Sequence, residues 1–287
     1  MLKLDVGVGN QGRRQCAYCV VRQNGLCSVF GDDAELDASG LEAAHMPVRV
    51  FNPGDCIYSQ GEGSDLVFNL VSGWVGLHQD MSDGRRQISQ FLLPGALFGV
   101  KPKGARRSHG ATAITTASVC AIPTVRLDEL RRDHPAFNEQ FIWMLQRENH
   151  VSQEALTIIG QGASPERVAR VLWDLAVRIC APRAIARGAV LKAPLTQRLI
   201  AEATGLTAIH VNRVVRRLRE QQVVDFHDGV MTIEDPDRLA ALADANPESA
   251  SCWDFGSGGG TELPTMAPQN LKTATPHDPP GARETRA

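Results

Sequence analysis

Between residues 48 and 122, apolar and polar positions alternate in short runs that are separated by turn sequences. The four runs are VRVFNPGDCIYSQGE, DLVFNLVSGWVGLHQ, RRQISQFLLPGALFG and ATAITTASVCAIP, with PGD, QGE, SGW, DGR and LPG turns. Period-two alternation broken by glycine turns is typical of antiparallel strands. We therefore predict a double-sheet jelly roll, a double-stranded β-helix, over this region.

The pattern then changes to a helical period. An apolar stripe runs from residue 127 to about residue 159, with a break at His134-Pro135 and a polar middle at residues 146–150. We predict a long helix whose polar middle favours a dimer of adjustable stability, because polar residues inside a helix–helix seam weaken it or set its register. A single helix lying on the roll is the alternative. The predicted dimer contacts are Phe141, Leu145, Asn149 and Leu156.

Residues 195–221 contain two short amphipathic helices that are separated by Gly205. Ser164 is predicted to cap the helix that precedes them, with Pro165 at its first position. A glycine turn between two short helices, with Thr207 capping the second, predicts a helix-turn-helix. The second helix would then enter the major groove. The candidate DNA-binding residues are Thr207, Ile209, His210, Asn212, Arg213, Arg216 and Arg217.

The local charge supports this interpretation. Residues 165–220 hold 11 Lys and Arg against 4 Asp and Glu, or 11 − 4 = +7, in a chain of formal net charge −2. Such an excess is typical of a module that binds a polyanion. The alternative is an ordinary helical hairpin whose arginines form a solvated face.

Length and composition limit the class of protein. At 287 residues and 43% hydrophobic content, the chain can bury two cores. It has no apolar run of about 18 residues and no signal peptide, so we expect no membrane segment and a cytoplasmic location. The seven cysteines are an odd number and favour metal ligation or core positions over disulfides.

Three of these cysteines form a C-x2-C-x7-C arrangement, namely Cys16, Cys19 and Cys27. Thiolates at this spacing can converge on one soft metal ion or cluster. Taken alone, the arrangement leaves an iron-sulfur site, a zinc site and unliganded thiols open, because no fourth ligand lies nearby in the sequence. Cys56 and Cys180 are interpreted as core residues.

A resemblance to a known family enters at the helix-turn-helix. The order TQRLIAEATGLTAIHVNRVVRRLRE, followed by VVDFHDGVMTIEDPDRL, resembles the winged helix-turn-helix of the bacterial CRP/FNR superfamily, and the strand spacing resembles its sensor domain. The resemblance covers roughly residues 14–245. Arg213 matches the family's guanine-reading arginine, whereas Ile209 replaces a glutamate and cannot accept a hydrogen bond from cytosine.

The resemblance implies an α+β fold with three parts: a jelly-roll sensor domain, a long dimerisation helix and a C-terminal winged helix-turn-helix. It implies a homodimeric transcription regulator, not an enzyme, that binds an inverted-repeat DNA operator and contacts RNA polymerase if it activates transcription. The predicted segments are residues 1–30 (cysteine-rich), 31–133 (sensor), 134–162 (dimerisation helix and hinge), 163–245 (DNA-binding domain) and 246–287 (disordered tail).

The same resemblance implies a cofactor. SVCAIPTVRLDEL resembles the segment that supplies the fourth cluster cysteine in FNR-type oxygen sensors, and Cys120 is the matching residue. The resemblance therefore implies a [4Fe-4S] cluster that is held by Cys16, Cys19, Cys27 and Cys120. Such a cluster would respond to oxygen or nitric oxide. The alternative for Cys120 is a small buried residue in a strand.

Cyclic nucleotide binding is not expected. Relatives that bind cyclic AMP carry a Gly-Glu pair and an Arg-Ser-Ala type segment where this chain has FGV at residues 98–100 and SHG at residues 108–110. Arg106 and Arg107 stand earlier, in a loop-like segment. A cupin enzyme shares the jelly roll but needs clustered histidines, whereas His78 and His109 lie far apart in the sequence. A regulator without a cluster and a zinc-stabilised DNA-binding protein remain alternatives.

Overall fold

The computed structural model describes residues 19, 21, 25–30, 47–181 and 183–245. These residues belong to one compact unit that ends at Gly256. The predicted tail at residues 246–287 and the ligand candidate Cys16 lie outside the described residues.

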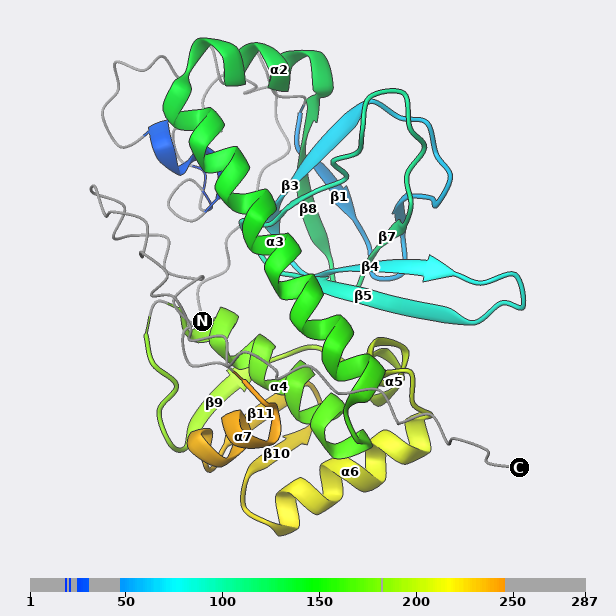
Figure 1. The fold of residues 1–287 in the computed structure, drawn as a ribbon, viewed down its shortest axis with the longest axis vertical. Coiled ribbons are helices and arrows are strands. Elements are labelled where there is room, and N and C mark those ends of the chain that lie inside the picture. The colour runs from blue at the N-terminus through cyan, green and yellow to red at the C-terminus, as the bar shows by residue number, and fades with distance from the viewer. Residues whose placement is uncertain (1–18, 20, 22–24, 31–46, 182, 246–287) are drawn as a thin grey trace, which may run out of the picture. The chain divides into compact units, whose positions relative to one another are not determined.

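Eight short strands form the predicted jelly roll from two four-stranded sheets (Figure 1). One sheet has the order β1-β8-β3-β6 and the other the order β2-β7-β4-β5. Every pairing in the two sheets is antiparallel. The strands are β1 (Arg49–Phe51), β2 (Cys56–Tyr58), β3 (Leu66–Ser72), β4 (Val75–Asp80), β5 (Arg86–Leu92), β6 (Leu97–Phe98), β7 (Gly110–Ala113) and β8 (Ala117–Pro123).

The alternating pattern places one face of each strand inside the roll. Leu70, Val75 and Val119 have no exposed surface and belong to one core cluster. The turn between β3 and β4 requires a glycine, because Gly73 has φ +84° and a Cβ there would lie 2.2 Å from the carbonyl oxygen of Thr116. The jelly-roll prediction is therefore confirmed.

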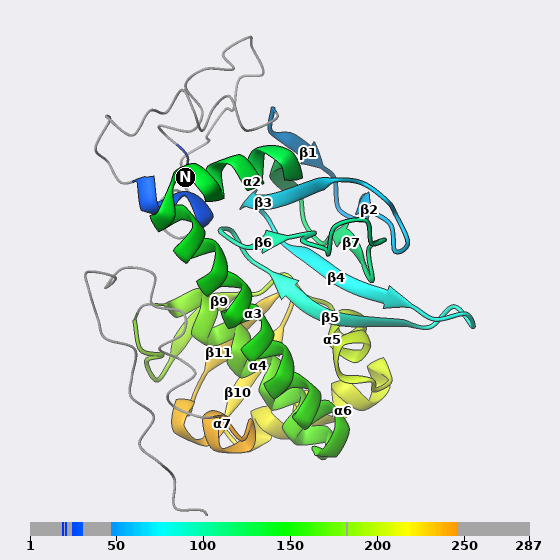
Figure 2. The same ribbon diagram turned by 45° about the horizontal axis from the view of Figure 1, so that its top comes forward.

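Two helices follow the roll, α2 (Thr124–Asp133) and α3 (Pro135–Gln161), and the short 3-10 helix η1 (Leu26–Phe30) packs against α3 (Figure 2). The predicted break lies at His134, which is extended because a proline follows it. Phe137, Phe141 and Met144 on α3 are buried with Leu26 of η1. This face of α3 therefore belongs to the core of its own chain.

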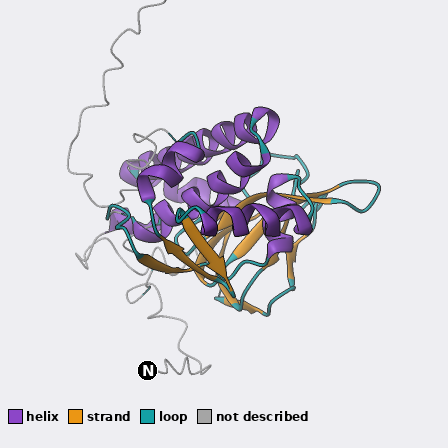
Figure 3. Cartoon of the chain, turned by 90° about the horizontal axis from the view of Figure 1, so that it is seen from below, coloured by secondary structure: helices purple, strands orange, loops and turns teal. Residues whose placement is uncertain are grey.

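The C-terminal elements form a helix-turn-helix with a small three-stranded sheet of order β10-β11-β9. Figure 3 distinguishes its helices from its strands by colour. Val168, Leu172 and Ile200 are fully buried in its core. The elements are α4 (Ser164–Cys180), β9 (Ala189–Lys192), α5 (Gln197–Thr204), α6 (Ala208–Glu220), β10 (Val224–His227), β11 (Val230–Ile233) and α7 (Pro236–Leu242).

Two local predictions are wrong. Ser164 does not cap α4 but is its first residue, and the capping position belongs to Ala163, whose backbone N–H donates to Glu166 Oε2 at 2.7 Å. Cys56 is exposed, because the first residue of β2 faces away from the roll interior. Among the described helices, none is long and apolar enough to cross a membrane.

Candidate nucleic-acid interface and sensor residues

Three local interactions define the ends of α5 and α6 and the turn between them. The hydroxyl of Thr196 accepts the backbone N–H of Leu199 at the start of α5, at 3.3 Å. Gly205 ends α5 with φ 69°, a left-handed conformation that disfavours other residues. Thr207 Oγ1 accepts the backbone N–H of His210 at 3.2 Å and begins α6. The predicted helix-turn-helix is thus fixed by its own sequence.

Helix α6 divides sharply into a buried and an exposed face. Val211, Val214, Val215 and Leu218 pack into the domain core. The predicted DNA-binding residues all lie on the exposed side, and the side chain of Ile209 is 68% exposed. The structure therefore presents these residues together on α6 and its N-cap: Thr207, Ile209, His210, Asn212, Arg213, Arg216 and Arg217.

The polar side chains on this face are held loosely. Arg216 Nε donates to Glu220 at 2.9 Å, and Asn212 Nδ2 donates to Gln197 Oε1 at 3.0 Å. Within the described part of the chain, neither Arg213 nor Arg217 has a carboxylate at ion-pair distance. Exposed guanidinium groups with few competing partners can reach guanine edges and phosphates.

Several arginines of the basic segment do not face solvent. Arg170 on α4 is 5% exposed and is bound by Glu154 of α3 and Asp174 of α4. Arg167 and Arg178 on the same helix are only partly exposed. A count of charges along the sequence could not show this, so the outward-facing positive surface is narrower than the +7 excess implied.

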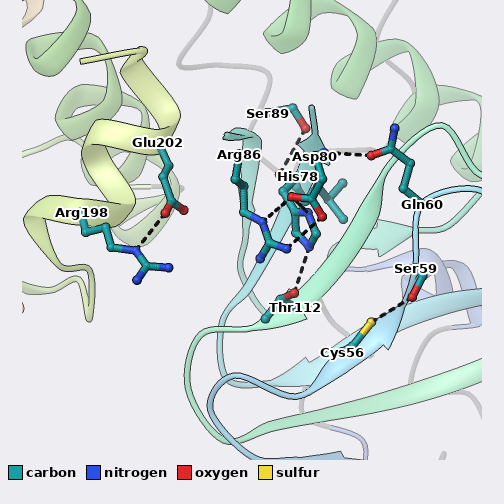
Figure 4. Close-up of polar contacts among 11 residues, drawn as sticks. Cys56, Ser59, Gln60, His78, Asp80, Arg86, Ser89, Thr112, Arg198 and Glu202 are labelled. Carbon is teal, nitrogen blue, oxygen red and sulfur yellow. Dashed lines mark hydrogen bonds and ion pairs between the residues drawn. The ribbon is translucent and has the colours of Figure 1, made fainter. Parts of the chain in front are cut away.

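Helix α5 contacts the roll through β5. Gln87 Nε2 donates to the carbonyl of Ala203 at 2.9 Å, and Ile88 and Phe91 of β5 join the core cluster of the helix-turn-helix. Arg86 binds Asp80, and this hydrogen bond, followed by the charges of Asp80 and Glu202, raises the pKa of Arg86 (Figure 4). The sequence carried no signal for the contact between α5 and β5.

Of the predicted cluster ligands, Cys27 and Cys120 can be placed relative to one core cluster of the structure. Ala117, Val119 and Ala121 of β8 point into the roll core, so Cys120 and Ile122 share the opposite face. Ile122 and Leu26 of η1 belong to one core cluster, and Cys27 packs against this cluster. Cys120 is therefore not a residue of the roll interior. Within residues 19, 21, 25–30, 47–181 and 183–245, no three His, Cys, Asp or Glu side chains are arranged to hold a metal.

The roll interior contains an arginine that the sequence placed in a loop. Arg107 is 3% exposed and donates to the carbonyls of Gly99 and Leu66, at 2.6 and 2.5 Å. Its guanidinium carbon lies 4.0 Å from the ring centroid of Tyr58. Burial raises the pKa of Tyr58, whose hydroxyl is hydrogen-bonded to His109 Nε2 at 2.9 Å. Two donors of Arg107 are thus engaged by backbone carbonyls, whereas its buried Nε has no hydrogen-bond partner among the described residues.

The predicted dimer residues do not share one environment. Phe141 is 3% exposed and packs under Arg131, so it belongs to the core of its own chain. Leu145 is 37% and Leu156 69% exposed, and Asn149 is also exposed. These three lie on an exposed side of α3. Phe141 is an intrachain core residue for which the apolar stripe gave no distinguishing signal.

Comparisons with known proteins agree with this architecture. Residues 48–134 match the cyclic nucleotide-binding domain model, and residues 166–242 match the Crp-like helix-turn-helix domain model. The chain is 31% identical to the transcriptional activatory protein AadR of Rhodopseudomonas palustris over 82% of this chain and 95% of that protein. It is 30% identical to the transcriptional activator protein Anr of Pseudomonas protegens, over 74% and 86%.

The solved structure of FixK2 from Bradyrhizobium japonicum has the same fold, with a TM-score of 0.63 and 26% identity over 70% of this chain and 98% of that one. The nitrogen fixation regulation protein FixK of Rhizobium meliloti is 32% identical over 68% of this chain and 86% of its own length. These relatives are regulators, in agreement with the exposed face of α6. The chain belongs to the CRP/FNR family of DNA-binding transcription regulators.

Proposed function

We propose that this regulator responds to oxygen or redox state through a [4Fe-4S] cluster held by Cys16, Cys19, Cys27 and Cys120, and that it acts in the cytoplasm. The observation that carries the proposal is the shared face of Cys120 and Ile122 on β8, because Ile122 packs with the η1 segment that contains Cys27. Thiolates are the ligands that such clusters require. Relatives include the anaerobic regulatory protein of Haemophilus influenzae, which is 26% identical to this chain.

The sensing logic is thermodynamic linkage. A cluster that joins these thiolates would add an oxygen-sensitive connection between η1 and β8. Helix α3 packs on η1, so a connection made through Cys27 favours the arrangement of α3 in which η1 is held. It can shift the conformational equilibrium only by its difference in affinity for the two arrangements.

We propose further that α3 forms a homodimer through Leu145, Asn149 and Leu156. Ile142 precedes them on the same face and is 41% exposed. The steps from Ile142 to Leu145, Asn149 and Leu156 are three, four and seven residues, which is the heptad spacing of paired helices. A polar Asn149 within this seam makes the pairing weak enough to be regulated.

In the dimer, two copies of α6 would read an inverted repeat with half-site centres about 10 base pairs apart. Arg213 is positioned to read guanine, and Ile209 to contact a thymine methyl group. RNA polymerase would be a further partner if the protein activates transcription.

No cyclic nucleotide is part of this proposal. In the roll, the guanidinium of Arg107 stacks on Tyr58 and donates through Nη1 and Nη2 to two backbone carbonyl oxygens, so these two donors are already used within the chain. A regulator without a cluster and a zinc-stabilised protein are the competing hypotheses for the cysteines.

Anaerobic purification separates these hypotheses. We expect a brown protein whose visible absorption bleaches in air, with about four iron and four sulfide per chain as the cofactor requires. Cys120→Ser should abolish iron loading, while Cys56→Ser, which alters an exposed thiol on β2, serves as the control and should load fully. Full iron and sulfide in Cys120→Ser would overturn the ligand assignment. A colourless protein that contains zinc would support the structural-metal hypothesis.

The dimer proposal has its own test. Asn149→Leu should strengthen association and produce operator binding in air, because an apolar residue replaces the polar one in the seam. Thr157→Leu adds a similar apolar side chain at an exposed position off the seam and should not change association. Equal monomer fractions for Asn149→Leu and the parent in sedimentation would count against α3 as the dimer helix.

A further inference from the structure

A cavity of about 70 Å³ lies where β5, α3, α4 and α5 meet. A water-sized sphere occupies about 10–15 Å³ by this measure, so the cavity holds roughly five non-hydrogen atoms. Ser89 and Ser152 at its margin are exposed, which opens it to solvent on the β5 and α3 side. The cavity is separate from the roll interior, from the cysteines and from the exposed face of α6.

The walls combine apolar side chains with guanidinium groups. Ile88 and Phe91 of β5, Ile158 of α3 and Val171 of α4 supply apolar surface. The cations come from three arginines of α4, and Asp174 is the only acidic residue among the described residues of the wall. The three arginines are Arg167, Arg170 and Arg178.

These cations are not equally neutralised. Arg170 is bound by two carboxylates, those of Glu154 and Asp174. Arg167 instead donates to carbonyl oxygens, to Gly162 at 2.8 Å and to Thr204 at 3.5 Å. Among the residues the structure describes, Arg167 forms no ion pair with a carboxylate. A partly buried charge that meets only neutral acceptors is a favourable place for an anion.

Burial also acts on the charges of two other wall residues, Arg178 and Asp174. Burial lowers the pKa of Arg178 to about 10, although the charges of Glu148 and Asp174 oppose this shift. Burial likewise raises the pKa of Asp174 to about 6, against the charge of Arg170. Burial therefore disfavours the charged forms of Arg178 and Asp174, while the carboxylates of Asp174 and Glu154 stabilise the charge of Arg170.

We propose that this cavity binds a small organic monocarboxylate, with the carboxylate on Arg167 and the short apolar body against Ile88, Phe91 and Val171. An inorganic oxyanion of similar size would satisfy the arginine but would desolvate against these apolar walls without compensation. The size of the cavity restricts the ligand to about five non-hydrogen atoms. The planar fork of an arginine fits a carboxylate through two parallel hydrogen bonds.

The position of Arg167 gives the ligand a route to the DNA-binding helices. Its guanidinium already joins Gly162, which follows α3, to Thr204, the last residue of α5. A carboxylate at Arg167 competes for donors of this link and changes how firmly α5 is held. This coupling rests on the function of the family, whereas binding itself does not.

Isothermal titration calorimetry of the full chain with sodium propionate tests the proposal, with sodium chloride at equal ionic strength as the blank. We expect saturable binding of one propionate per chain with a dissociation constant below about 10 mM, which is well within the limit for five non-hydrogen atoms. Arg167→Gln should weaken binding at least tenfold. Arg183→Gln removes an exposed arginine outside the cavity and should bind like the parent.

A second variant guards against a structural effect of the first. Ala155→Leu places a larger side chain in the cavity without removing a charge and should abolish binding while the thermal unfolding transition remains cooperative. Absence of propionate binding to the parent, or unchanged binding by both variants, would overturn the proposal. Inorganic phosphate that binds more tightly than propionate would overturn the choice of a carboxylate with an apolar body. Iron content and operator binding are measured separately, so failure here leaves the proposed function untouched.

Discussion

The arginines of α4 and the arginines of α6 are close in sequence, yet the structure uses them differently. Arg170 on α4 is 5% exposed and held by two carboxylates. Arg213 on α6 is exposed and has no carboxylate partner among the described residues. The first set joins α3 to the DNA-binding domain, whereas the second is available to DNA. Burial and partner, and not residue type, decide which arginines bind nucleic acid.

The largest expected effect comes from breaking the buried set. Arg170→Met leaves the carboxylates of Glu154 and Asp174 without their shared cation. Removing one partner of a buried ion pair costs about 3–5 kcal/mol. The side chains of Glu154 and Asp174, although largely buried, keep 18% and 26% of their surface exposed, so we expect a loss of about 2–4 kcal/mol in the free energy of unfolding, measured by urea denaturation. Arg183→Met, at an exposed site, should stay within about 0.5 kcal/mol of the parent.

If Arg170→Met unfolds at the same urea concentration as the parent, the buried arginine is not structural. The arginines of α4 would then contribute no more to stability than the exposed arginines of α6.

The acid in the same network gives a pH-dependent effect. Burial raises the pKa of Asp174 from 3.8 to about 6. Between these two values the unfolded chain ionises this group while the folded chain keeps it protonated, so its contribution to stability is present at low pH and falls as pH rises toward 6. The shift corresponds to roughly 1–3 kcal/mol.

Asp174→Asn removes this titration. The difference in unfolding free energy between parent and Asp174→Asn should therefore decrease from pH 4 to pH 6 and then level off. A difference that is constant with pH, or one that increases over this range, would contradict the raised pKa.

The helix-turn-helix was predictable because its signals are local. Gly205 at the turn and Thr207 at the cap act within three or four residues of their positions, and both are confirmed. The strand alternation of the roll is equally local. The predicted cap at Ser164 was one residue late, because the pattern seeks a serine before proline, whereas the helix begins after Ala163, whose backbone N–H donates to Glu166.

The features that the sequence did not reveal depend on contacts between distant elements. The apolar stripe of α3 contains both Phe141, which packs on its own chain, and Leu145, which is exposed, and periodicity does not say which side meets the roll. Likewise, the charge count from residue 165 to residue 220 included Arg170, whose partner Glu154 lies on another helix. The burial of Arg107 was likewise not predictable from local sequence, because its carbonyl partners come from two other segments of the chain.

The smallest effect on stability is expected at an exposed arginine of α6. Arg216 is exposed, and among the residues that the structure describes its ion-pair partner is Glu220, four residues along α6. Its replacement by alanine should change the unfolding free energy by no more than about 0.5 kcal/mol. DNA binding should weaken alike on all sequences, and the slope of log affinity against log salt should fall by about one. An unchanged salt slope in fluorescence anisotropy would show that Arg216 meets no phosphate.

The central claim, that α6 reads DNA through Arg213, is tested most directly by comparing Arg213→Ala with the parent on specific and non-specific duplexes. The specific duplex is an inverted repeat with half-site centres about 10 base pairs apart. Arg213→Ala should cost about 1–3 kcal/mol on this duplex, relax base preference at one symmetric pair of positions and leave non-specific affinity nearly unchanged. Equal losses on both duplexes, with the same base preference as the parent, would contradict the assignment.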